Sequence, residues 1–207
     1  MRPGWGGPRH RTYNRAIERA TAVSKGLARD LLEVFVLALG LYLLATFSIQ
    51  TVHVVGFSMY PTLDSGDLLL ASKLDYRIHN PERGDIVILK DPLDPTKDFI
   101  KRVVGLPGDH VLIRDHHVLI NGVALTEPYV ETWQATPNWP QQPDAIDGET
   151  VPPSSFFVLG DNRDHSSDSR VFGYIGRDQI DAKAVARFWP FAHADLLNLR
   201  PTLAKEP

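Results

Sequence analysis

The stretch DFIKRVVGLPGDHVLIRDHHVLINGVAL, residues 98–125, decides the fold class of this chain of 207 residues. Its first part is an apolar run of strand length that ends in Gly-Leu-Pro-Gly, residues 105–108, which predicts a turn. The residues after this corner have the pattern of two hairpin arms and a third strand, and Asn121-Gly122 predicts a type I′ turn between the last two. The stretch therefore predicts consecutive β-strands with no helix between them.

The rest of the chain beyond residue 50 repeats this pattern. Short apolar or β-branched runs bounded by Gly, Asp or Pro occupy residues 51–57, 67–74, 84–91, 155–160 and 182–189. Such spacing favours a mainly β domain, a sandwich or barrel, over residues 51–192. Residues 126–153 are rich in proline and lack periodicity, which predicts a long irregular loop or a small appended lobe. We expect residues 193–207 to form a peripheral tail.

A strongly apolar segment, LLEVFVLALGLYLLATFSI at residues 31–49, precedes the β-rich part and has Glu33 as its one ionisable side chain. A helix needs about 20 apolar residues to cross a bilayer, and a glutamate near its end is tolerated. Secretory signals usually have a shorter apolar stretch of about 7–15 residues and a small-residue cleavage site. We therefore predict an uncleaved transmembrane anchor at residues 31–50 rather than a buried core helix.

Charge predicts the orientation of this anchor and argues against one class of partner. Residues 1–30 hold seven basic side chains and two acidic ones, a bias that keeps this head in the cytoplasm and exports the remainder as a single-pass type II protein. The remainder has fifteen basic and twenty-three acidic residues, so we expect no nucleic-acid partner. Cysteine is absent, which excludes disulfides and thiol catalysis. The pair His116-His117 lacks further ligands at useful spacing, so we predict no metal and no cofactor.

A serine follows the anchor closely, in GFSMYPTLDSGD at residues 56–67. The Ser58 hydroxyl becomes a nucleophile only when a base removes its proton. Among the eight histidines only His165, in DNRDHSSDS, has a plausible setting, and such polar turns more often use histidine for loop hydrogen bonds. A lysine can serve instead, because burial lowers its pKa. Strand alternation places Lys101 on one face with Phe99 and Val103, although an edge lysine pointing to solvent fits the same segment.

Four sequence blocks in order after an N-terminal anchor, GFSMYPTL, RGDIVIL, KRVVGLPGD and GDNRDHSSDSR, resemble the type I (bacterial) signal peptidases. The resemblance covers roughly residues 56–170 and extends loosely to Phe188-Trp189-Pro190. It implies two antiparallel β-sheets and a serine–lysine dyad endopeptidase on the outer face of the cytoplasmic membrane. Such an enzyme removes signal peptides after small residues of Ala-X-Ala type, through an acyl-enzyme.

The resemblance also implies roles for individual residues. Ser58 would be the nucleophile, with its backbone N–H in the oxyanion hole, and Lys101 the general base. Ser166 would orient the lysine amine, and Asp168 and Arg170 would form a supporting pair. Residues 160–162 would hold the junction between strand and loop. Some family members have a serine where this chain has Gly56, so the second oxyanion donor stays open.

The implied partners are preproteins that carry a signal peptide, and the lipid bilayer. An extended peptide end can pair as an added strand with its side chains in pockets. We expect shallow pockets lined by Met59, Leu63, Val54, Phe99 and Ile100 to reject large side chains. Aromatic side chains at Trp133, Trp139 and Phe156-Phe157 fit either the membrane interface or core packing. Nothing in the sequence calls for more than a monomer.

Three alternatives fit parts of the pattern. A self-cleaving serine–lysine repressor-type protease would have a DNA-binding head and no membrane span. A membrane-anchored β module with vestigial motifs would lack Ser58 or Lys101, and both are present. A eukaryotic-type signal peptidase subunit would carry histidine as the base, where this chain has KRVVG.

Overall fold

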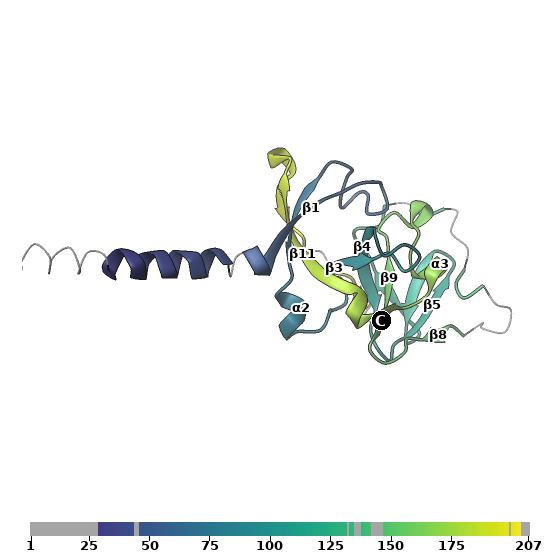
Figure 1. Ribbon diagram of the computed structural model, residues 1–207. Helices are drawn as coiled ribbons and strands as arrows, with labels where there is room; N and C mark the ends of the chain where they lie inside the picture. Colours follow the sequence, from purple (N-terminus) through teal and green to yellow (C-terminus); the bar gives the residue numbers. More distant parts are fainter. Residues whose placement is uncertain are drawn as a thin grey trace, which may run out of the picture. The chain divides into compact units, whose positions relative to one another are not determined.

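The computed structural model describes residues 29–43, 46–131, 133–134, 138–141, 147–198 and 200–203. It divides into a unit that ends at Thr46 and a β-rich unit that begins at Phe47 (Figure 1). The predicted cytoplasmic head lies outside the described residues except for Arg29 and Asp30, and so do parts of the predicted loop at 126–153.

A helix, Arg29–Ser48, of 20 residues with a mean hydropathy of 2.1 begins in the N-terminal unit and ends two residues beyond it. The helix is long and apolar enough to cross a membrane, and none of its most apolar window is buried by protein. Its large apolar side chains are exposed, as in Leu37 and Leu41. Glu33 lies near the first turn, where it pairs with Arg29 at 3.2 Å. A helix that is apolar all round and has no protein cover is what a lipid environment favours.

The larger sheet of the β-rich unit is antiparallel throughout. Its central strand β3 (Ile86–Lys90) is buried on both faces, which explains its unbroken apolar run IVIL. The strand order is β1 (Ile49–His53), β2 (Leu68–Ser72), β11 (Ile180–Trp189), β3, β4 (Asp98–Gly105), β9 (Ser155–Leu159) and β10 (Ile175–Gly176), with β12 (Asp195–Leu196) paired to β11.

The smaller sheet contains the hairpin that the sequence predicts. Asn121 and Gly122 have φ values of +52° and +83° between β6 and β7, as a type I′ turn requires. The strand order is β13 (Thr202–Leu203), β7 (Val123–Thr126), β6 (His117–Ile120), β5 (His110–Arg114) and β8 (Glu149–Thr150). The mainly β architecture and the two antiparallel sheets are therefore confirmed.

Three apolar clusters fill the space around the sheets. Ile86 and Ile88 of β3 point into one cluster and Val87 and Leu89 into a second, so alternate side chains of one strand serve both faces. The third cluster packs β9 against the smaller sheet and includes Trp139 and Phe157. Phe156 belongs to the second cluster. These three aromatics are at most 8% exposed, so a membrane-interface role for them is wrong: they are core residues.

Short helices and the C-terminal segment complete the β-rich unit. The helices are α2 (Asp75–Ile78), η1 (Arg163–His165), α3 (Ser169–Phe172), η2 (Arg177–Gln179) and η3 (Phe191–His193). In the C-terminal segment, β13 pairs with β7 at the edge of the smaller sheet, Pro201 is buried, and Arg200 pairs with Asp85 at 3.2 Å. The ion pair and the strand pairing together hold residues 200–203 against the β-rich unit.

Candidate active site

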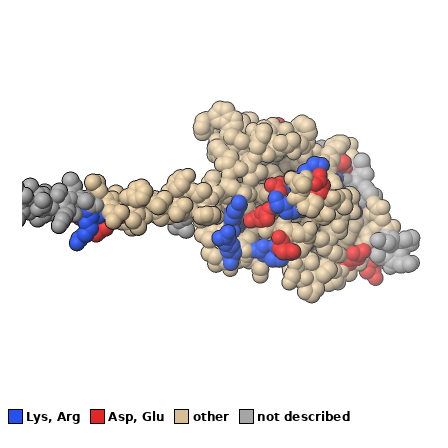
Figure 2. Space-filling view, in the orientation of Figure 1, with Lys and Arg blue, Asp and Glu red and all other residues tan. Residues whose placement is uncertain are grey.

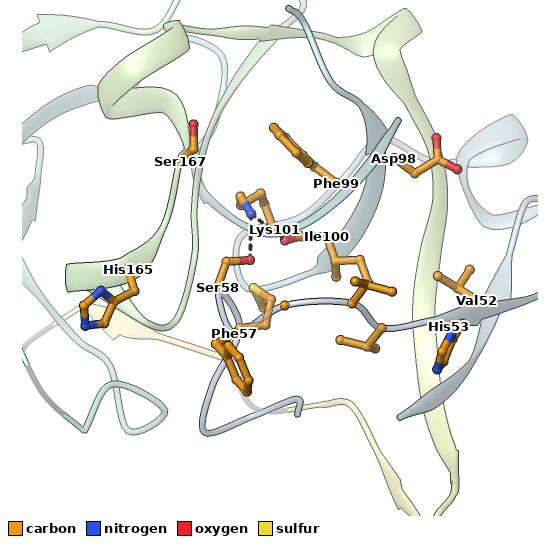
Figure 3. A pocket seen from close by; sticks show the side chains of 14 residues that line it. Val52, His53, Phe57, Ser58, Asp98, Phe99, Ile100, Lys101, His165 and Ser167 are labelled. Carbon is orange, nitrogen blue, oxygen red and sulfur yellow. Dashed lines mark hydrogen bonds between the residues drawn. The ribbon is translucent and has the colours of Figure 1, made fainter. Parts of the chain in front are cut away.

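Ser58 and Lys101 lie side by side in the β-rich unit. Ser58 begins the turn that follows β1, and Lys101 is in the middle of β4. Lys101 Nζ donates a hydrogen bond to Ser58 Oγ at 2.8 Å and another to the carbonyl oxygen of Ile100 at 3.1 Å (Figure 3). The two side chains that the sequence pairs as nucleophile and base are thus in direct contact.

Lys101 occupies an apolar setting. It is 3% exposed, and its Nζ lies 4.9 Å from the centre of the Phe99 ring. Burial lowers the pKa of Lys101 to about 8, because a charged amine loses its hydration in this setting. The nearby carboxylates of Asp168 and Asp161 act in the opposite direction, and Arg170 adds to the lowering. Of the two settings that the sequence allows for Lys101, the structure therefore has the buried one and not the solvent-exposed edge.

The turn that carries Ser58 is fastened to the loop after β9. The Asn162 backbone N–H donates to the Ser58 carbonyl at 3.1 Å, and its side-chain amide donates to the Phe57 carbonyl at 3.1 Å. A Cβ atom at Gly160 would meet Ser166 Oγ at 2.2 Å and the Ser58 carbonyl oxygen at 2.4 Å. Only glycine therefore allows the two segments to approach this closely.

A buried ion pair beneath this junction was not predicted from the sequence. Arg102 donates to both carboxylate oxygens of Asp161, at 2.8 and 2.7 Å, and Thr62 Oγ1 donates to the same carboxylate at 2.5 Å. Arg102 also lies over the ring of Tyr129, and both members of the pair are at most 1% exposed. The pair connects β4 to the segment after the nucleophile. Strand alternation puts Arg102 on the face of β4 opposite Lys101, and a buried arginine there calls for a carboxylate partner.

The pair expected between Asp168 and Arg170 is present. Arg170 Nε and Nη2 donate to the two oxygens of Asp168, each at 2.7 Å. Asp168 is fully buried and also accepts from the backbone N–H of Gly160 at 3.0 Å. This carboxylate therefore ties the α3 segment to the glycine that contacts the Ser58 turn.

The hydrogen bond expected from Ser166 to the lysine amine is not formed in this structure. Ser166 Oγ is buried and has no hydrogen-bond partner among the described residues. The hydroxyl lies against Gly160, 2.2 Å from where a Cβ atom would be, while Lys101 Nζ donates to Ser58 and to the carbonyl of Ile100. Ser166 is thus beside the site with its hydrogen-bonding capacity unused.

A pocket of about 330 Å³ surrounds the Ser58–Lys101 pair. Four of the predicted pocket residues line it, namely Val54, Met59, Phe99 and Ile100. Leu63 does not, because it is fully buried in the core cluster that also contains Val54 and Met59. The lining further includes His165 and Ser167 beyond Ser58, and Val52, His53 and Asp98 on the opposite side (Figure 3).

Two strand edges border this pocket. β1 is the last strand of its sheet, and the pairing of β4 with β9 begins only at Arg102. Within the described residues, the segment 98–101 therefore has a neighbouring strand on one side only, β3. Gly56, between β1 and Ser58, has a φ of +97° and no atoms within 4 Å of where a Cβ would lie.

The chain is similar to known proteins over most of its length. The family described as signal peptidase, peptidase S26, matches residues 28–189. Signal peptidase I of Leptolyngbya laminosa is 42% identical over 163 residues, which cover 75% of this chain and 74% of that protein. The probable signal peptidase I-2 of Synechocystis sp. is 36% identical over 178 residues, covering 83% and 76% of the two chains.

A solved structure is similar as well. It is a signal peptidase I from Enterococcus faecalis V583, 34% identical, with a TM-score of 0.44, covering 52% of this chain and 98% of that one. The family match spans most of the chain, and the two relatives exceed 30% identity over about three quarters of their own length. The chain therefore belongs to the signal peptidase family, peptidase S26.

Proposed function

We propose that this protein is a membrane-anchored serine endopeptidase that cleaves signal peptides from exported preproteins. The observation that carries the proposal is the 2.8 Å contact between Ser58 Oγ and the buried amine of Lys101. Family membership supports the same reaction class. Because the pKa of Lys101 is about 8, a fraction of the amine is uncharged near pH 7. This uncharged amine can act as the base that activates the Ser58 hydroxyl.

The neutral amine of Lys101 takes the Ser58 hydroxyl proton as Oγ attacks the scissile carbonyl. The Ser58 backbone N–H donates to the oxyanion that forms. Lys101 then gives its proton to the leaving amine, and the acyl-enzyme remains on Ser58. In the second half Lys101 accepts a proton from water, the resulting hydroxide attacks the ester, and Ser58 recovers its proton when the ester breaks.

We assign supporting roles to the residues around this pair. Asp168 and Arg170 hold the loop that faces Lys101, and their charges act on its pKa in opposite directions. Ser166 has an unused hydroxyl beside the site, so we assign it the orienting contact to the lysine amine in the substrate complex. Contacts of this kind are often loose before substrate binds.

The substrate would enter as an extended strand between the edge of β1 and residues 98–101 of β4. Both edges have backbone groups available for such pairing. The apolar walls formed by Val54, Met59, Phe99 and Ile100 leave shallow pockets. Small side chains such as alanine at the first and third positions before the cut fit this lining.

The helix Arg29–Ser48 would anchor the protein in the cytoplasmic membrane, with residues 1–30 inside and the β-rich unit outside. This orientation rests on the basic head and on the length of the helix. It places the site on the side where a signal peptide emerges from the bilayer. We propose that the protein acts there as a monomer.

The test is cleavage of a preprotein with an Ala-X-Ala end by the detergent-purified full-length protein, with the cut located by mass spectrometry. We expect cleavage after the final alanine by the wild type. Ser58→Ala and Lys101→Ala should lose at least about 10³-fold in kcat, as removal of members of a catalytic dyad or triad does elsewhere. Leu93→Ala, a change at a 78% exposed side chain that does not line the Ser58 pocket, is the control for expression and handling. A folded wild type that cleaves no such preprotein would overturn the proposal.

A further inference from the structure

A second hollow of the β-rich unit, of about 360 Å³, lies beside α2 and away from the Ser58 pocket. Its lining shares no residue with that pocket. Three of the six lining residues are basic, one is acidic and two are uncharged: Lys73, Arg77, Arg177, Asp181, Tyr76 and Ile180. The hollow is therefore a cationic site that the peptidase chemistry does not use.

The basic side chains of this hollow are not neutralised by carboxylates. Within the described residues, no ion pair is found for Lys73, Arg77 or Arg177. Arg177 is held in place, since it donates to the Tyr76 carbonyl and its guanidinium lies 5.3 Å from the centre of the Tyr76 ring. Asp181 already pairs with Lys90 at 3.4 Å. A fixed guanidinium with two further cations is an arrangement that suits a phosphate group.

Lys73 is bonded to the end of the apolar helix, which favours a phosphate that belongs to a membrane lipid. The Lys73 backbone N–H donates to the Ser48 carbonyl at 2.8 Å, and Ser48 is the last residue of the helix that is long enough to span a membrane. If that helix spans the bilayer, Lys73 lies at the level where the helix leaves it. Figure 2 shows lysine and arginine side chains at the end of the β-rich unit where β1 begins.

We propose that Lys73, Arg77 and Arg177 form a binding site for the phosphate headgroup of an anionic phospholipid. Basic residues at a membrane surface attract anionic lipids. A hollow of this size accommodates a phosphodiester headgroup, and Tyr76 and Ile180 supply apolar contact beside it. The site would fix the β-rich unit at the bilayer surface next to its anchor. The inference rests on the membrane anchoring stated under the proposed function.

The test uses the full-length protein in neutral detergent micelles with increasing mole fractions of phosphatidylglycerol. Hydrogen exchange of the amides of residues 73–79 and 177–181 reports occupancy of the hollow. We expect saturable slowing with phosphatidylglycerol, and none with phosphatidylcholine. Sodium phosphate at the same concentration should slow exchange far less, because it is not concentrated in the micelle.

The variant Lys73→Gln/Arg77→Gln should raise the half-saturating lipid fraction by about tenfold or more, since each basic residue near a surface contributes about 1 kcal/mol. The matched control is Lys97→Gln/Arg114→Gln, which removes two exposed basic residues elsewhere and should leave the half-saturating fraction unchanged. Arg77→Glu alone, at an exposed position, guards against a folding defect in the double variant and should weaken the effect likewise.

Equal slowing in the basic-site variants and the control would overturn the inference, and so would equal slowing by phosphatidylcholine or by sodium phosphate. The readout does not depend on peptide cleavage. Lipid-dependent protection in a protein that cleaves no preprotein would contradict the peptidase assignment alone. Normal cleavage without protection would contradict the lipid site alone.

Discussion

Lys101 Nζ lies 2.8 Å from Ser58 Oγ, although the two residues are 43 positions apart, Ser58 in the turn after β1 and Lys101 in the middle of β4. The contact depends on two features away from the reacting atoms. Burial among apolar side chains lowers the pKa of Lys101, and the Gly160–Asn162 loop holds the Ser58 turn in place. Each feature predicts the effect of a substitution.

Lys101→Met should make the protein more stable at pH 7 while abolishing cleavage. The folded-state pKa of Lys101 is lowered to about 8 from an ordinary value of 10.5, so the folded state binds this proton less tightly than the unfolded state does. Lys101 therefore lowers the free energy of unfolding most below pH 8, by up to about 3 kcal/mol, and this destabilisation disappears as pH rises towards 10.5. Methionine fills similar volume without charge.

The measurement for this variant is the thermal unfolding midpoint of wild type and variant between pH 6 and 10. The gap should narrow as pH rises. Ser58→Ala, which keeps the lysine, should follow the wild-type pH dependence. A Lys101→Met variant that is less stable than wild type at pH 7 would contradict the account of a destabilising buried amine.

Arg170→Met should move the pH dependence of cleavage to higher pH. The Arg170 charge lowers the pKa of Lys101, whereas Asp168 raises it, so removal of the guanidinium raises this pKa although burial still lowers it. A base with a higher pKa is protonated to a greater extent at pH 7, so kcat/KM falls there and recovers in part at alkaline pH. The pH profile of kcat/KM measures this. A uniform loss at all pH values would show that Arg170 has only a structural part.

Asp161→Ala should destabilise the protein by about 3–5 kcal/mol, because it removes the carboxylate that accepts two hydrogen bonds from the buried Arg102 guanidinium. The double variant Arg102→Met/Asp161→Leu removes both charges and should recover most of this loss. Chemical denaturation of the three proteins gives the comparison. Asp94→Ala, which breaks a pair on the exposed surface, is the control and should change little. Equal instability of the single and double variants would show that packing, and not the unpaired charge, causes the effect.

Gly160→Ala should reduce kcat/KM strongly with a smaller effect on stability. The added methyl would lie 2.2 Å from Ser166 Oγ and 2.4 Å from the Ser58 carbonyl oxygen, so the Ser58 turn must shift. A displacement of about 1 Å at reacting groups can cost 10²-fold in rate. Gly40→Ala, in the apolar helix where no atoms lie near the added methyl, serves as the matched substitution and should keep full activity. Full activity of Gly160→Ala would show that the junction tolerates the shift.

Local patterns in the sequence predicted the parts of the fold that depend on neighbouring residues. The turn at Asn121-Gly122 and the alternation that buries Lys101 beside Phe99 both follow from period-2 strands and turn chemistry. The short helix α2 was missed because four residues, Asp75–Ile78, are too few to show a helical period. Leu63, expected in the substrate pocket, is instead fully buried in the core.

Contacts between distant segments could not be predicted in the same way. Arg102 meets Asp161 across 59 positions, and Arg163 meets Glu127 across 36. No local pattern states which carboxylate will be brought to which guanidinium, since that depends on the order of strands in the sheet. Pro201 packs so closely on Gly84 that a Cβ there would come within 2.7 Å of the proline ring. This contact also joins segments far apart in the sequence, and no local pattern predicts it.

The central claim is that Lys101, and not His165, is the base for Ser58. The most direct measurement is kcat/KM for an Ala-X-Ala preprotein between pH 5 and 10. Because the base must be neutral to accept the serine proton, we expect kcat/KM to rise with pH and to level off above about 8, the pKa of Lys101, in wild type and in His165→Asn alike. A kcat/KM that levels off near pH 6.5, the ordinary pKa of free histidine, in wild type and loses this pH dependence in His165→Asn would contradict the role of Lys101 as the base.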